Sequence, residues 1–133
     1  MANGTIAFDT LSTSGQITGT AKSVDTDYLA SGSAKSWANL NGTGTIALRD
    51  SLNVASITDD GTGDYDFTYT NAMGNVNYSI QMGNSFTTTS AWANFDAGGE
   101  VPTTAFFNMS VFDRNGSAQD ATYAYFGIDG DLA

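Results

Sequence analysis

The chain has 133 residues, the length of one ordinary domain, and 41% of them are hydrophobic, which is enough to build a core. It has no cysteine and no histidine, which excludes disulfides, thiolate chemistry and the usual general base at neutral pH. Four basic residues against fourteen acidic ones give a net charge of -10, which argues against binding to nucleic acid or to an anionic membrane surface.

The first 33 residues are predicted to form an N-terminal arm. They are rich in Ser, Thr and Gly and contain one short strand candidate at residues 5–8. Two interpretations remain open: a mobile tail with an edge strand, or an arm that becomes ordered against a neighbouring subunit. In the second, Phe8 and Leu11 are among the side chains that a subunit interface would bury.

From residue 34 to residue 133 the sequence predicts one β-domain. Alternating apolar and polar residues indicate strands at residues 35–40, 45–49 and 52–57. The first two strands are joined by an Asn-Gly-Thr-Gly turn at residues 41–44, which predicts a hairpin.

Two further strands are expected in the middle of the chain. At residues 64–70 the aromatic side chains alternate with polar ones, and residues 76–82 repeat this pattern. The five residues between them, 71–75, have a length typical of a hairpin loop.

Two late strands are predicted at residues 104–113 and 121–128. The first carries apolar residues on both faces, with Phe106 and Phe112 on one face and Phe107, Met109 and Val111 on the other. Such a strand lies in the middle of a sandwich or at a subunit interface, so Phe106 and Phe112 are candidate interface residues.

No segment combines a helical apolar stripe with caps, so no helix of useful length is expected. About eight short strands with turn residues between them predict an all-β fold, an antiparallel β-sandwich or jelly roll with a short N-terminal arm.

We expect no catalytic residue, no cofactor and no metal site. The best metal candidate is the Asp-Asp-Gly-Thr-Gly-Asp run at residues 59–64, which lacks the alternating oxygen ligands and the late Glu of a calcium loop. We interpret it as a turn. The abundant Ser and Thr residues have no histidine to activate them, and the acids lie in turns or on polar strand faces.

Aromatic side chains are the candidates for contact with a glycan or a protein partner. Trp37 lies in the middle of a predicted strand and is expected in the core or at an interface. Trp92 lies in a segment with the composition of a loop, and with the nearby Phe95 it is the better candidate for stacking on a sugar. Packing of Trp92 beneath its own loop remains an equal alternative.

Part of the sequence resembles a structural β-module of tailed bacteriophages. The resemblance is carried by AKSWANLNGTG at residues 34–44 and NVASITDDGTGDY at residues 53–65, and it continues through Phe67, residues 71–73 and Asn77-Tyr78. It covers about half of the chain. Leu40 departs from the pattern, which usually has an aromatic there, and no motif is identified after about Asn84.

The resemblance implies a non-enzymatic virion component, since the module is found at the ends of tail fibres and in small phage structural proteins. The sequence has no heptads and no collagen-like repeat to form a fibre shaft, which favours a capsid decoration or head-appendage protein. A tail-fibre tip that binds a host-surface glycan is the alternative.

We expect the protein to be made in the host cytoplasm and located in the virion. Its expected partners are other copies of itself, as a homotrimer, and virion proteins such as the major capsid protein. No segment approaches the roughly 20 apolar residues of a membrane span, so membrane insertion is not expected.

Overall fold

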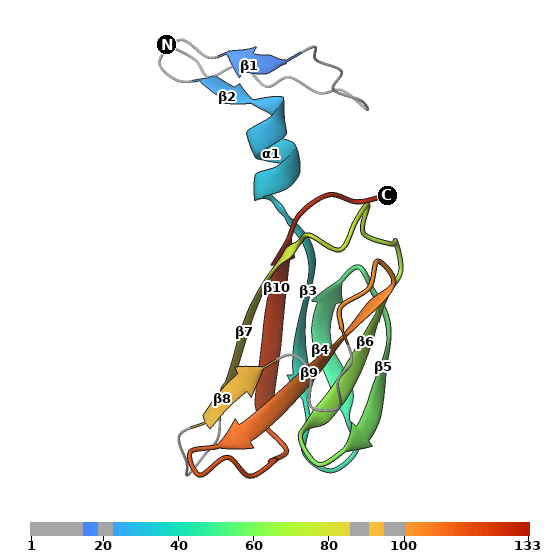
Figure 1. The fold of residues 1–133 in the computed structure, drawn as a ribbon, viewed down its shortest axis with the longest axis vertical. Coiled ribbons are helices and arrows are strands. Elements are labelled where there is room, and N and C mark those ends of the chain that lie inside the picture. Colours follow the sequence, from blue (N-terminus) through green and yellow to red (C-terminus); the bar gives the residue numbers. More distant parts are fainter. Residues whose placement is uncertain (1–14, 19–22, 86–90, 95–100) are drawn as a thin grey trace, which may run out of the picture.

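A computed structural model describes residues 15–18, 23–85, 91–94 and 101–133. In it, strands with alternating apolar and polar side chains form two four-stranded antiparallel sheets that pack face to face. The first sheet has the order β4-β3-β10-β7, and the second has the order β5-β6-β9-β8 (Figure 1). In these orders the strands are β4 (Ala47–Leu52), β3 (Ala34–Asn41), β10 (Tyr123–Asp129) and β7 (Ser79–Ser85), then β5 (Val54–Gly61), β6 (Asp64–Tyr69), β9 (Phe106–Asp113) and β8 (Ala91–Asn94). The predicted all-β antiparallel sandwich is confirmed.

The segment before the sandwich contains β1 (Gln16–Thr18), β2 (Ser23–Asp25) and the short helix α1 (Thr26–Gly32). In Figure 1 these elements lie beyond the end of the sandwich at which β3 begins. The sequence predicted no helix of useful length, and α1 is a short one of seven residues. At its end, Ser33 Oγ donates to the Leu29 carbonyl at 2.8 Å, which satisfies one carbonyl of the last turn. The strand expected at residues 5–8 lies outside the described residues.

Both tight turns, predicted from Asn and Gly at residues 41–44 and from Asp and Gly at residues 59–64, form hairpins. The β3–β4 pair closes at the partners Asn41 and Ala47, and the β5–β6 pair closes at Gly61 and Asp64. The predicted strand at residues 52–57 is divided at Asn53, which has a φ of 57°. Here the chain leaves the first sheet at the end of β4 and enters the second sheet as β5.

The hairpin predicted across residues 71–75 was wrong, because β6 and β7 belong to different sheets. Buried Met73 holds the connection against the body of the sandwich, where its N–H donates to the Thr104 carbonyl at 2.8 Å. The next N–H, of Gly74, donates to the Asp131 carbonyl at 2.8 Å. A five-residue connection has the length of a hairpin loop, but these contacts direct the chain across the sandwich instead.

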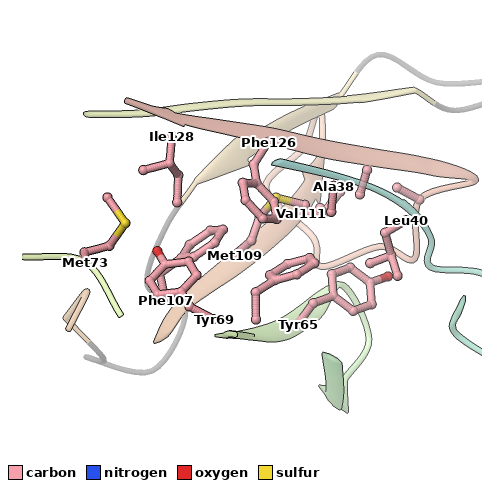
Figure 2. Packing of buried hydrophobic residues seen from close by; sticks show 13 residues of the cluster. Ala38, Leu40, Tyr65, Tyr69, Met73, Phe107, Met109, Val111, Phe126 and Ile128 are labelled. Atoms are coloured by element: carbon pink, nitrogen blue, oxygen red, sulfur yellow. The ribbon is translucent and has the colours of Figure 1, made fainter. Parts of the chain in front are cut away.

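The core lies between the sheets and is built around aromatic rings. Phe107 of β9 contacts Phe126 of β10 edge to face, with ring centroids 4.6 Å apart, and stacks on Phe67 of β6 at 5.2 Å. Figure 2 shows Ile128, Phe126, Ala38 and Leu40 of one sheet meeting Tyr65, Tyr69, Phe107, Met109 and Val111 of the other. The core faces of all these strands are thereby buried, so any contact with another molecule falls to their outer faces. Among the described residues, no helix is long and apolar enough to cross a membrane.

Candidate functional site

Trp92 and Phe112 form an aromatic pair on the outer face of the second sheet. They are register partners on β8 and β9, and their rings stack with centroids 6.3 Å apart and planes at 29°. Trp92 stays 47% exposed. The loop predicted around Trp92 was wrong at residues 91–94, which form β8. The small and polar residues there are typical of a loop, and only pairing with the distant β9 makes them a strand.

An open cleft of about 380 Å³ adjoins this pair at the end of the sheet where β5 turns into β6. This volume lies within the roughly 300–1,000 Å³ of small-molecule sites. Phe112 lines the cleft, and Trp92 stacks on Phe112 from the neighbouring edge strand β8. The lining residues are Asp60, Gly61, Thr62, Gly63, Asp64, Ser110, Phe112 and Ala118.

The wall formed by the β5–β6 turn is fixed by Gly63, which has a φ of 67°. A Cβ at this position would lie 2.5 Å from the Val111 carbonyl oxygen, so only glycine fits. The Gly63 N–H donates to Asp120 Oδ1 at 2.8 Å, and the Val111 N–H donates to the Gly63 carbonyl at 2.7 Å. These bonds connect the turn to β9 and to the segment after it.

A polar network beside the cleft orients the carboxylates of β6. Asn108 of β9 is buried and donates through Nδ2 to Asp64 Oδ1 at 2.6 Å and to Asp66 Oδ1 at 3.1 Å. Ser110, also buried, donates to Asn108 Oδ1 at 3.3 Å. The site therefore presents carboxylate and hydroxyl groups in fixed positions next to aromatic rings.

Acidic side chains give the cleft a negative electrostatic potential. Desolvation and the neighbouring carboxylates of Asp66, Asp64 and Asp59 raise the pKa of Asp60 above its ordinary value of 3.8. None of the residues that line the cleft is basic. Within the described part of the chain, no group of three or more Asp, Glu, His or Cys side chains is placed to hold a metal ion.

Of the other residues predicted to contact a partner, only some lie in the part of the chain that the structure describes. Phe106 is half-buried on the same outer face as Phe112, at the opposite end of β9, while Phe107, Met109 and Val111 face the core. Phe8, Leu11 and Phe95 lie outside the described residues. The structure therefore brings Trp92 and Phe112 together and leaves Phe106 apart from them.

A second aromatic surface lies on the outer face of the first sheet. Of its residues only Trp37 was considered from the sequence, and it lies there and not in the core. Leu52, Tyr123 and Tyr125 are each 43–47% exposed there, and half-buried Trp37 pairs with Leu52. We call these four residues the aromatic face. The signal was present at residues 123–126, where Tyr alternates with Ala and Phe and aromatic rings fall on both sides of the strand.

Two contacts hold the tyrosines of the aromatic face in place. The guanidinium of Arg49 lies over the Tyr123 ring at 4.2 Å from its centroid. Tyr125 lies against Gly83 of β7, where any Cβ would overlap the ring. The rings are therefore positioned before any partner binds, which reduces the entropy cost of association.

No protein-family model matches the chain, and no curated protein or solved structure matches it either.

Proposed function

We propose that this protein is a non-enzymatic structural protein of the bacteriophage particle surface, of the capsid decoration or head-appendage type. The observation that carries the proposal is the aromatic face, a set of large side chains exposed together on one sheet. Its physical basis is that Leu52, Tyr123 and Tyr125 each leave nearly half of the side chain exposed, and burial of this apolar surface against a partner favours association. The phage assignment rests on the resemblance of residues 34–65 to the tailed-phage module.

The chemistry of the chain supports a contact function. It has no histidine and no cysteine, and the cleft offers carboxylates without a partner base. We infer that the aromatic face mediates self-association as a homotrimer or contact with the capsid lattice.

Light scattering and particle analysis test this proposal. We expect the purified chain to have the mass of a trimer, and Leu52→Asp to shift it towards the monomer, because it places a charge on the aromatic face. Val101→Asp, at a more exposed valine, is the matched control and should leave the mass unchanged. Mass spectrometry of gradient-purified particles should find the chain in the capsid fraction. A stable monomer would refute the homotrimer, and absence of the chain from particles would refute the proposal.

A second candidate function, receptor binding at a tail-fibre tip, is favoured by the exposed Trp92 beside the cleft. A glycan array is the test, with Trp92→Ala expected to abolish any specific signal. Tyr28→Ala, at an exposed ring of α1, is the control.

A further inference from the structure

We propose that the cleft beside Trp92 and Phe112 binds a sugar unit that carries a protonated amine. The proposal rests on the receptor-binding candidate and narrows its ligand to one chemical class.

The aromatic pair supplies the surface for the sugar ring. A pyranose presents a face of C–H groups that packs on an aromatic ring, and Phe112 offers such a ring as a wall of the cleft. Trp92, on the edge strand β8, lies on the other side of Phe112 from the β5–β6 turn, and its ring stacks behind that of Phe112 at a centroid distance of 6.3 Å. Because both residues are on paired strands, the wall is held by the sheet and is formed before the ligand arrives.

Next to Phe112 on the same face of the sheet, Asp64 and Ser110 supply polar groups of fixed position. Asp64 is held by the Asn108 amide at 2.6 Å, and Ser110 is buried at the base of the same strand face. Carboxylate oxygens accept from sugar hydroxyls, and they accept more strongly from an ammonium group. An apolar ring beside a few fixed polar groups is the arrangement that orients a small polar ligand.

The charge of the cleft selects among sugars. Asp60 and Asp64 line it, Asp66 lies beside them, and no lining residue is basic. An acidic sugar would be repelled, whereas an ammonium group would relieve the repulsion among these carboxylates and lie near the aromatic rings. A glucosamine-type unit offers the ring face, the hydroxyls and the ammonium group, whereas its N-acetylated form keeps the ring face and the hydroxyls but has no positive charge for the carboxylates.

The test compares a trimer of β-1,4-linked glucosamine with the matching trimer of N-acetylglucosamine, by calorimetry and by amide NMR titration of the full chain. We expect the glucosamine trimer to bind and to shift the amide signals of Gly61, Gly63 and Phe112. The acetylated trimer should bind at least about tenfold more weakly, since it lacks the charge-assisted hydrogen bonds.

Two pairs of variants locate the binding. Asp60→Asn should weaken binding of the glucosamine trimer about tenfold, while Asp50→Asn, the same change on the other sheet, should leave it unchanged. Trp92→Ala should weaken it about 3- to 30-fold, and Tyr28→Ala should not. A urea midpoint for each variant confirms that it is folded.

Three results would overturn the proposal: no binding of the glucosamine trimer, equal binding of the acetylated trimer, or equal weakening by Asp50→Asn, which would indicate general attraction to an acidic protein. None of these bears on the trimer mass or on the presence of the chain in particles, so failure here is distinguishable from failure of the structural role. Failure of the receptor-binding candidate is also separate, because a glycan-array signal for a neutral sugar that depends on Trp92 would retain it.

Discussion

Asn53 and Asn71 are joined by three hydrogen bonds at the end of the sandwich where the chain crosses twice between the sheets. Asn53 Oδ1 accepts from the Asn71 backbone N–H at 2.7 Å and from Asn71 Nδ2 at 3.2 Å, and Asn53 Nδ2 donates to the Asn71 carbonyl at 3.0 Å. Asn53 lies between β4 and β5, and Asn71 follows β6. Asn53 and Asn71 therefore connect the two segments in which the chain passes from one sheet to the other.

Asn53→Ala should lower the free energy of unfolding by about 2 kcal/mol. It removes three hydrogen bonds, and it leaves alanine, which has no polar side chain to stabilise this backbone conformation, at a φ of 57°. Asn53→Gly removes the same bonds but tolerates the backbone angle, so it should cost roughly half as much. Urea unfolding measures both. Equal losses for the two variants would show that backbone conformation contributes nothing at this position.

Gly42→Ala should destabilise the domain more than its small change in volume suggests. The Tyr65 hydroxyl donates to the Gly42 carbonyl at 3.2 Å, and a Cβ on Gly42 would overlap that hydroxyl, which is buried. We expect a loss of about 2 kcal/mol by urea unfolding, since overpacking typically costs 1–3 kcal/mol. Gly127→Ala, whose Cβ would meet only Gln81 Oε1 at 3.6 Å, is the control and should be nearly neutral. A neutral Gly42→Ala would contradict the packing described here.

Alkaline pH should unfold the protein through its buried tyrosines. Burial, and then the hydrogen bond to Tyr78, raise the pKa of Tyr69 above its ordinary value of 10.0. Because the folded-state pKa is the higher one, the stability from this group is complete below pH 10 and is lost as the pH rises above it.

The urea midpoint should therefore decline above pH 10, and Tyr69→Phe should make that decline shallower. Tyr28→Phe, a change at an exposed ring, is the matched control and should leave the profile unchanged. An identical decline in wild type and Tyr69→Phe would exclude Tyr69 as a source of the pH dependence.

Asp60→Asn should raise stability at neutral pH, although it is the change expected to weaken ligand binding. The pKa of Asp60 is raised in the folded state by desolvation and by the Asp66, Asp64 and Asp59 carboxylates, so its ionisation works against folding. The urea midpoint of Asp60→Asn should exceed that of wild type at pH 7, and the difference should vanish at pH 3, where the carboxyl is protonated. Added salt should also reduce it. A lower midpoint at pH 7 would show that Asp60 is stabilising.

The sequence by itself determined the local structure of most strands. Alternation in residues 64–69 was enough to identify β6 and to assign its core face, because the pleat places every second side chain on the same side. Residues 106–113 were predicted to be a strand with apolar residues on both faces, and the structure shows that Phe107, Met109 and Val111 face the core. The Gly-containing turns at residues 41–44 and 61–63 likewise specified two hairpins, since few residues adopt those backbone angles.

Only the tertiary structure decided how the strands are distributed between the sheets and which side chains meet on the surface. The connection at residues 71–75 fits a hairpin and a crossing equally well by length, and contacts of Met73 with residues distant in sequence select the crossing. Trp92 stacks on Phe112 because the consecutive strands β8 and β9 pair in that register, and Tyr125 covers Gly83 because β10 pairs with the distant β7. Alternation fixes the face on which a residue lies, but strand order and register fix its neighbours, and these depend on non-local packing.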